Sequence, residues 1–304
     1  MKWGFKGPEM GIQYGKVTGA AFNEARWIGG GIVPSLVILH DTASRIAKGN
    51  AARYLQSNDA KVSVHFVIER DGHIEQQVPV NRKASHAGKS EYHGREWCNG
   101  FSIGIELVNP GRMTRAAPEL ARTWFGQKFN IPEYGIEETE TPQHGHGLWM
   151  PYTEAQISAL LGLLQTLFSS IPTLEDITTH WYVSPGRKVD TNPLFPLKHI
   201  RSLILGRTDP AEAELGDEET PAAADDFVII STPGDTLNMR RWPSFNPNVI
   251  AQIPDNTRVP VIASVTVAGR EWLKVFYGGA AGWVVESYAD PVTISKPGFK
   301  GAET

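Results

Sequence analysis

Short apolar runs and one long stretch with helical spacing alternate along the first two thirds of the chain. The short runs are rich in β-branched and aromatic residues, which favour strands. They cover 36–40, 64–69, 73–78, 101–107 and 177–181. Asp71 and Gly72 separate the second and third runs, and this pair is typical of a tight hairpin. We therefore predict five short strands, two of them joined by a hairpin turn.

Helical spacing is clearest at 153–171, where apolar residues recur every three or four positions. Thr153 and Gln156 form a capping-box pattern at the start of this stretch. We also expect helices at 44–56 and 197–205. Strands that alternate with helices predict an α/β fold, with a mixed central sheet flanked by helices.

The C-terminal part has a different pattern. Its short apolar runs are separated by Pro, Gly and Asn turns, which predicts a small all-β barrel or sandwich. The runs cover 227–231, 248–253, 258–264, 272–277 and 282–287. The stretch before them contains eight acidic residues against one basic residue and almost nothing to bury, as in a flexible linker. We expect a larger domain at 1–206, an acidic linker at 207–226, a β domain at 227–291 and a tail at 292–304.

Composition narrows the class of protein. Of the 304 residues, 41% are hydrophobic and 20% are charged, which are ordinary values for a chain that buries a core. The net charge of −4 comes mainly from the acidic stretch, so neither folded part is basic enough to predict nucleic-acid binding. The single cysteine, Cys98, excludes an intramolecular disulfide and is expected to be a structural or idle thiol.

Neither an export signal nor a membrane span is expected. The first residues, MKWGFKGPEMGIQYG, are broken by Gly, Pro and Glu9 where a signal peptide needs an unbroken apolar run. We therefore expect synthesis in the cytoplasm without a Sec signal. The longest weakly polar run, 28–39, contains three glycines and Pro34 and is shorter than the roughly 20 residues of a membrane span.

Residues of catalytic type stand at the ends of the apolar runs. His40 closes the first run and His180 lies near the end of the last, and strand ends are favoured ligand positions in α/β sheets. Asp190 follows His180 through a loop that contains Pro185 and Gly186, so the chain can turn back toward the same point. Each of these residues taken alone also fits a structural role.

Five strings, in this order, give those residues a context: LVILHDTAS, VSVHFVIERDGHIEQQVP, ASHAGKS, FSIGIELVN and THWYVSPGRKVDTNPLFP. Through them the chain resembles the zinc-dependent N-acetylmuramoyl-L-alanine amidases of type 2, which are related to phage lysozyme-amidases and peptidoglycan-recognition proteins. The resemblance implies cleavage of the amide between the lactyl group of N-acetylmuramic acid and L-alanine of the stem peptide.

By position in these strings, the resemblance implies that His40, His180 and Asp190 bind Zn²⁺. Two imidazoles and a carboxylate leave a fourth position open for water, whose pKa falls to about 7 on zinc. Glu106 takes the position of the general base, and Lys188 that of a cation beside the developing oxyanion. A buried carboxylate such as Glu106 is costly unless it has a partner or a function.

Other residues of the matching part are open to two interpretations. His65 and His86 lie in the matching strings but outside the ligand positions, so we assign them to the cleft wall or to substrate contacts. The stretch 111–150 has the character of an insertion that walls a cleft. Its aromatic residues either stack on sugar rings or pack the insertion onto the sheet; they are Trp124, Phe125, Phe129, Tyr134 and Trp149.

The C-terminal strings LNMRRWPS, EWLKV and GWV resemble a bacterial SH3-like domain. Such barrels bind peptidoglycan peptides, so the resemblance implies that this part tethers an enzyme to the wall. Trp242, Phe245 and Trp272 are either contact residues or buried packing of the barrel.

The resemblances together predict a zinc hydrolase that degrades peptidoglycan, either an endolysin or a delivered effector that acts on the cell wall after release or delivery. Two alternatives stay open: a cytoplasmic amidase that recycles muropeptides, and a non-catalytic peptidoglycan-binding protein. The expected partners are peptidoglycan or muropeptides, without nucleic acid or stable membrane insertion, and the oligomeric state is left open.

Overall fold

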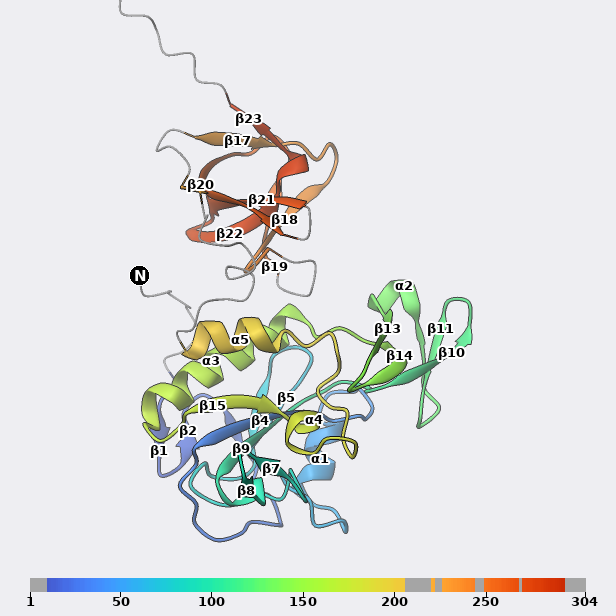
Figure 1. Cartoon of the computed structure of the whole chain (residues 1–304), viewed down its shortest axis with the longest axis vertical. Coiled ribbons are helices and arrows are strands. Elements are labelled where there is room, and N and C mark those ends of the chain that lie inside the picture. The colour runs from blue at the N-terminus through green and yellow to red at the C-terminus, as the bar shows by residue number, and fades with distance from the viewer. Residues whose placement is uncertain (1–9, 206–219, 222–225, 244–248, 268–269, 293–304) are drawn as a thin grey trace, which may run out of the picture. The chain divides into compact units, whose positions relative to one another are not determined.

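The computed structural model describes residues 10–205, 220–221, 226–243, 249–267 and 270–292. The chain divides into two compact units, Met1–Arg207 and Thr208–Thr304, which we treat separately (Figure 1). The predicted linker at 207–226 lies outside the described residues except at 220, 221 and 226, and the predicted tail except at 292. No helix in the described ranges is long and apolar enough to cross a membrane.

The first unit is built on a six-stranded sheet in the order β15-β4-β9-β5-β6-β3. Its strands are β3 (Ala21–Phe22), β4 (Leu36–Asp41), β5 (Phe66–Ile68), β6 (Ile74–Gln76), β9 (Ser102–Leu107) and β15 (Asp176–Thr179). The four strands β15, β4, β9 and β5 are parallel, whereas β6 runs antiparallel to β5. The chain turns between β5 and β6 at Gly72, which has a φ of 83°. The predicted mixed sheet and its hairpin are therefore confirmed.

Side-chain alternation along the central strands separates two faces of the sheet. In β9 the sequence SIGIEL puts its three apolar residues on one face and Ser102, Gly104 and Glu106 on the other. The parallel register sets His40 of β4 directly beside Glu106 of β9. His40 and Glu106 thus lie on the same side of the sheet.

Two longer helices, α3 (Glu154–Ser170) and α5 (Leu197–Leu205), pack against each other and lie over the sheet (Figure 1). The backbone N–H of Gln156 donates to the side chain of Thr153, and the Gln156 side chain accepts from the backbone N–H of Thr153, so the capping box is confirmed. The Gln156 amide also donates to the carbonyl oxygens of Ile68 and Val108. These bonds join the first turn of α3 to the ends of β5 and β9.

Several elements are shorter than predicted, among them β5 (Phe66–Ile68) and β6 (Ile74–Gln76), for which 64–69 and 73–78 were expected. The helix expected at 44–56 begins only at Asn50 (α1, Asn50–Gln56), because Gly49 has a φ of 75° and a continuous α-helix does not allow that value. The strand expected at 177–181 ends at Thr179. His180 is the first residue of the four-residue helix α4 (His180–Val183).

The stretch 111–150 forms a separate five-stranded antiparallel sheet in the order β12-β11-β10-β14-β13. Its elements are β10 (Met113–Ala117), β11 (Leu120–Thr123), β12 (Lys128–Asn130), α2 (Ile131–Tyr134), β13 (Glu137–Thr141) and β14 (Gly145–Trp149). Phe129 and Trp149 are buried, whereas Trp124, in the turn after β11, is 78% exposed. The burial of Phe129 and Trp149 agrees with packing of the insertion, whereas stacking of Trp124 on sugar rings stays a prediction.

Three smaller elements complete the first unit. The short strands β1 (Ile12–Gln13) and β2 (Lys16–Val17) form one hairpin. A second hairpin consists of β7 (Glu91–Tyr92) and β8 (Arg95–Glu96). A 3₁₀ helix follows at Cys98–Gly100, and the thiol of Cys98 is buried there.

The second unit is rich in strands, in the order β19-β18-β22-β21-β20-β17-β23, with β16 paired to β20. They are β16 (Thr220–Pro221), β17 (Phe227–Ile230), β18 (Thr236–Arg240), β19 (Val249–Pro254), β20 (Arg258–Val267), β21 (Arg270–Tyr277), β22 (Ala280–Val285) and β23 (Ala289–Pro291), with a 3₁₀ turn at Glu286–Tyr288. All five predicted runs correspond to strands. Trp242 and Trp272 are buried, in agreement with packing, and Phe245 lies outside the described residues.

Candidate active site

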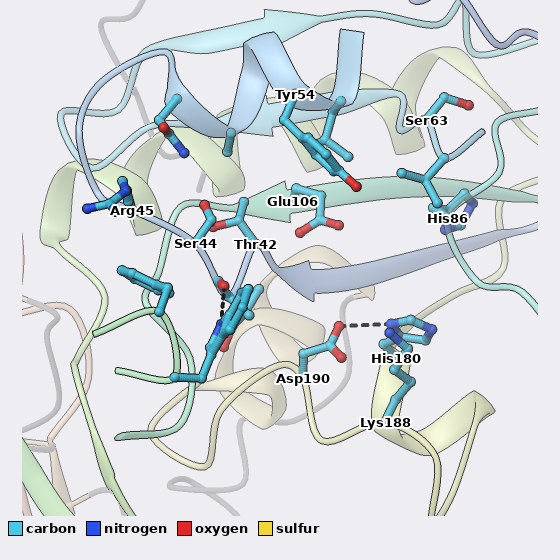
Figure 2. A pocket seen from close by; sticks show the side chains of 18 of the residues that line it. Thr42, Ser44, Arg45, Tyr54, Ser63, His86, Glu106, His180, Lys188 and Asp190 are labelled. Atoms are coloured by element: carbon cyan, nitrogen blue, oxygen red, sulfur yellow. Dashed lines mark hydrogen bonds and ion pairs between the residues drawn. The ribbon is translucent and has the colours of Figure 1, made fainter. Parts of the chain in front are cut away.

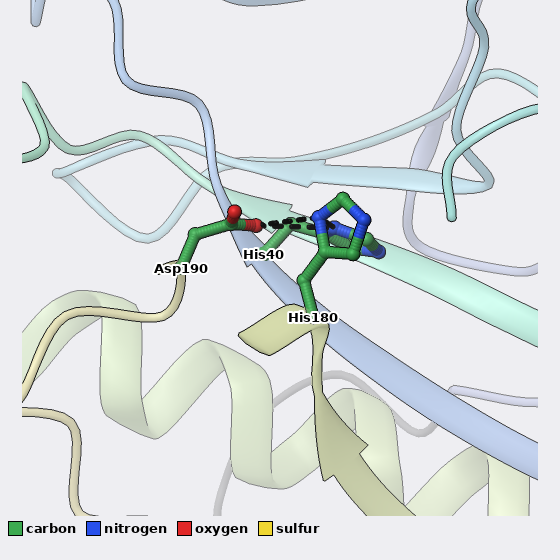
Figure 3. A group of neighbouring side chains, drawn as sticks. All are labelled: His40, His180 and Asp190. Carbon is green, nitrogen blue, oxygen red and sulfur yellow. Dashed lines mark hydrogen bonds and ion pairs between the residues drawn. The ribbon is translucent and has the colours of Figure 1, made fainter. Parts of the chain in front are cut away.

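His40, His180 and Asp190 lie together where β4 ends (Figure 3). The Nδ1 atoms of His40 and His180 are 2.9 Å apart. Oδ2 of Asp190 lies 2.9 Å from Nδ1 of His180 and 3.3 Å from Nδ1 of His40. Tetrahedral zinc with bonds of about 2.0–2.1 Å separates its ligand atoms by roughly 3.3 Å. The three donor atoms therefore fit around one such ion.

Two of these residues also have the charge state that a metal ion needs. Burial and the neighbouring His180 lower the pKa of His40 to about 4, so its ring is neutral at pH 7. Burial alone would raise the pKa of Asp190, but its contacts with His180 and His40 outweigh burial and hold that pKa below its usual value. A neutral imidazole and an ionised carboxylate are the forms that bind metal.

Each of the two imidazoles makes another contact through its second nitrogen. Nε2 of His180 lies 3.2 Å from the carbonyl oxygen of Ala87. A carbonyl oxygen only accepts, so this contact favours the tautomer with its proton on Nε2 and its lone pair on Nδ1, whereas the Arg187 guanidinium, a donor, lies 3.4 Å from the same nitrogen. Nε2 of His40 lies 2.9 Å from Nδ1 of His86.

Glu106 and Lys188 line the same cavity, of about 610 Å³, as His180 and Asp190 (Figure 2). Oε2 of Glu106 is buried and has no hydrogen-bond partner within the described part of the chain. Burial raises the pKa of Glu106 well above its usual value, the charges of Asp190 and Asp41 add to this effect, and the Lys188 ammonium opposes it. A carboxyl group of raised proton affinity inside a pocket is suited to general acid–base chemistry.

Asp41 is a further residue at the site, and the sequence analysis did not single it out. Its carboxylate accepts hydrogen bonds from the Tyr152 hydroxyl and, at 2.9 Å, from the backbone N–H of Asn192. Asn192 lies two residues after Asp190, so these bonds hold the loop that carries Asp190 against β4. The position directly after His40 was the only signal of this role in the sequence.

The insertion supplies part of the pocket wall through Trp124 and Phe125. The indole N–H of Trp124 donates to the carbonyl oxygen of Ala43 at 2.9 Å. The Arg45 guanidinium lies 5.5 Å from the centre of the Phe125 ring. Figure 2 shows Arg45 and His86 toward opposite ends of the pocket, with the carboxylates of Glu106 and Asp190 toward its middle.

The two histidines assigned to the cleft wall differ in position. His86 lines the pocket as predicted. His65 is fully buried: its Nδ1 accepts from the backbone N–H of Gly104 at 3.0 Å, and its Nε2 donates to the carbonyl oxygen of Arg82 at 2.9 Å. The assignment of His65 to the cleft wall was therefore wrong, because both ring nitrogens are used by the backbone.

Comparison with known proteins gives a family match over the part of the chain that contains this site. A sequence model described as N-acetylmuramoyl-L-alanine amidase matches residues 30–193, more than half of the 304 residues. The 1,6-anhydro-N-acetylmuramyl-L-alanine amidase AmpD of Salmonella typhimurium is 36% identical over 145 residues, which are 47% of this chain and 58% of AmpD.

A more distant relative is the N-acetylmuramoyl-L-alanine amidase CwlA of Bacillus subtilis, 25% identical over 159 residues, which are 51% of this chain and 57% of CwlA. The chain thus spans less than two thirds of the length of either relative. Among solved structures, a selenomethionine derivative of AmpD is 26% identical with a TM-score of 0.45, covering 64% of this chain and 98% of that one.

Proposed function

Since the chain belongs to the family of N-acetylmuramoyl-L-alanine amidases, we propose that it hydrolyses the amide between the lactyl group of N-acetylmuramic acid and L-alanine of the stem peptide. Peptidoglycan or its muropeptide fragments are then the substrates. The main observation in support is that His40, His180 and Asp190 lie close together, and that His180 and Asp190 line the same pocket as Glu106.

We assign His40, His180 and Asp190 as ligands of Zn²⁺. The spacing of their donor atoms and the charge states of His40 and Asp190 support this assignment. When bound, the ion supplies a Lewis acid for the amide carbonyl and lowers the pKa of water.

The side chains of the pocket supply the proton transfers and part of the charge stabilisation. Glu106 acts as the general base and takes a proton from the attacking water, for which its raised proton affinity suits it. As the oxygen–carbon bond forms, the carbonyl oxygen becomes negative and the Lys188 ammonium stabilises it. Glu106 then gives the proton to the L-alanine nitrogen as the carbon–nitrogen bond breaks.

We propose that the second unit is an SH3-like wall-binding domain and that the protein acts on intact wall, as an endolysin or a delivered effector. The β-rich fold of the second unit supports this proposal. A binding unit raises the effective concentration of an enzyme at an insoluble substrate, whereas soluble fragments need none. The similarity to a 1,6-anhydro-N-acetylmuramyl-L-alanine amidase favours a second candidate, a recycling enzyme for soluble anhydro-fragments.

Mass spectrometry of the products tests both candidates. The protein is incubated with purified sacculi and, separately, with soluble anhydro-muropeptides, with and without a chelator and with zinc added back. We expect stem peptides that start at L-alanine to be released from sacculi, lost on chelation and restored by zinc. Release from the soluble fragments alone would favour the recycling enzyme.

A His180→Ala variant is the matched control because it removes a ligand and leaves Glu106 in place. It is expected to release no peptide from either substrate. Equal release by this variant and the native protein would contradict the proposed centre. No release by the native protein from either substrate would contradict the amidase assignment itself.

A further inference from the structure

We infer that His86 is a positioning residue, which fixes the ring of the ligand His40 through a chain of hydrogen bonds that ends on the backbone. The inference rests on the metal centre proposed above and adds a residue to it. His86 belongs to neither the ligand set nor the proton-transfer steps.

The chain of contacts has three links. Nε2 of His40 is 2.9 Å from Nδ1 of His86. Nε2 of His86 is 3.3 Å from the hydroxyl oxygen of Ser102, and that hydroxyl donates to the carbonyl oxygen of Cys98 at 2.6 Å. Four groups are therefore linked in series from the candidate ligand to the main chain.

The Cys98 carbonyl oxygen at the end of the chain fixes which group donates in each of the three hydrogen bonds. The Cys98 carbonyl only accepts, so the Ser102 hydroxyl donates to it and accepts from Nε2 of His86. Nδ1 of His86 then has the lone pair and accepts from Nε2–H of His40. This leaves the lone pair of His40 on Nδ1, the atom that faces His180 and Asp190. The chain thus selects the tautomer of His40 that binds metal.

Two features of the fold hold the His86 ring in this place. A Cβ atom added at Gly104 would lie only 2.5 Å from Cγ of His86, so the ring occupies space that a side chain at 104 would take. The backbone N–H of His86 also donates to Oδ1 of Asn99 at 3.1 Å. Ser102 and Gly104 are on the face of β9 that also carries Glu106, so one strand supports the ring and bears the proposed base.

His65 provides a matched control within the same sheet. Its ring lies near that of His86, with the ring centres 5.7 Å apart, yet its nitrogens bond only to backbone groups and not to His40. Loss of His65 perturbs the packing of the sheet without breaking the chain to the ligand. Comparison of variants at the two positions therefore separates positioning from general stability.

The test measures the zinc affinity of the full chain by competition with a chromophoric chelator, together with the unfolding midpoint of the metal-free protein. Removal of such an outer partner of a ligand weakens metal binding by about 10-fold to 100-fold. We expect this loss for His86→Leu. The variant His86→Asn keeps an acceptor oxygen near the position of Nδ1 and is expected to retain most of the affinity. For Gly104→Ala, which displaces the ring, we expect a loss in the same direction as for His86→Leu.

The outcomes separate this inference from the proposed function. If the native protein binds no zinc, the metal centre itself fails. If the native protein and His86→Leu bind zinc equally, the positioning role is wrong. An equal loss of affinity in His65→Asn also overturns it, because the effect would then be general. Where His86→Leu does not fold, Ser102→Ala breaks the next link of the chain, and unchanged affinity in that variant contradicts the inference.

Discussion

Glu106 shares its pocket with two other carboxyl groups, those of Asp41 and Asp190, and its proton affinity depends on these surroundings. Burial acts first, and the charges of Asp190 and Asp41 act in the same direction. In the register of the sheet Glu106 adjoins His40, so the candidate base and a candidate ligand have a fixed relative position.

Glu106→Gln keeps the shape of the side chain and removes its ability to accept a proton. Positioned general bases contribute typically about 100-fold to 10,000-fold to rate, and we expect kcat on a muropeptide to fall by that factor. The zinc content of the variant should match that of the native protein. A fall of less than threefold in kcat, with zinc retained, would remove Glu106 from the mechanism.

The stability of the metal-free protein should depend on pH through His65. Burial lowers the pKa of His65 from 6.5 to about 4 in the folded chain. Between these values the unfolded chain binds a proton that the folded chain does not, so the free energy of unfolding falls as the pH falls. The full contribution is present above pH 6.5 and is lost below about pH 4, with a total of at most about 3 kcal/mol.

Urea unfolding of the metal-free protein at neutral pH and near pH 5 measures this dependence. The variant His65→Asn keeps an acceptor for the Gly104 amide but does not titrate in this range. We expect it to be less stable at neutral pH and to lose less stability on acidification. Identical slopes for the two proteins would show that His65 does not contribute.

At the scale of elements, the insertion at 111–150 contributes both a small core of its own and two aromatic residues at the pocket. The turn after β11 brings Trp124 to the loop that follows β4, where its indole bonds to Ala43. The exposed indole face is available for a substrate ring or alkyl chain. The insertion therefore places an exposed aromatic face at the pocket wall.

Trp124→Ala should raise KM for muropeptides by about 3-fold to 10-fold and leave kcat nearly unchanged, because the contact is with bound substrate in both ground and transition states. Steady-state kinetics on a soluble muropeptide measure this split. Trp97 is the control: it is 59% exposed and does not line the pocket. An equal rise in KM for Trp97→Ala would indicate a nonspecific effect.

Arg45 is exposed, its guanidinium lies 5.5 Å from the centre of the Phe125 ring, and it has no ion pair to another described residue. A guanidinium in this state binds carboxylates. The muramoyl side of the scissile amide is uncharged, whereas a stem peptide ends in a carboxylate. We expect Arg45→Ala to raise KM for peptides with free carboxylates but not for the same peptides amidated. Equal effects on both would exclude a charge contact.

Local periodicity made much of the fold predictable. The apolar alternation of 101–107 and the capping box at Thr153 are signals within a few residues, and both elements formed as expected. The predicted start of α1 was wrong because a single left-handed residue, Gly49, delays the start of the helix to Asn50. The contact between Asp41 and Tyr152 joins positions 111 residues apart, and no local pattern records it.

At the scale of the whole molecule, each unit has a hydrophobic core of its own. In the second unit that core includes Ile230, Val275 and Val284. A protein that ends at Arg207 should therefore fold and hydrolyse soluble muropeptides at the native rate, but should not be retained on sacculi. Sedimentation with sacculi and a kinetic assay together measure this. Full retention by the shorter protein would contradict the wall-binding role of the second unit.

The pairing of β4 with β15 has a consequence for synthesis. β4 is a fully buried strand near the start of the chain, and His180, just after its partner, lies 140 residues beyond His40. During translation one edge of β4 therefore stays unpaired until β15 has been synthesised. Unpaired apolar strand edges promote association with other chains. Because the candidate ligands His40 and His180 come from both ends of this stretch, an incomplete nascent chain lacks the proposed metal centre.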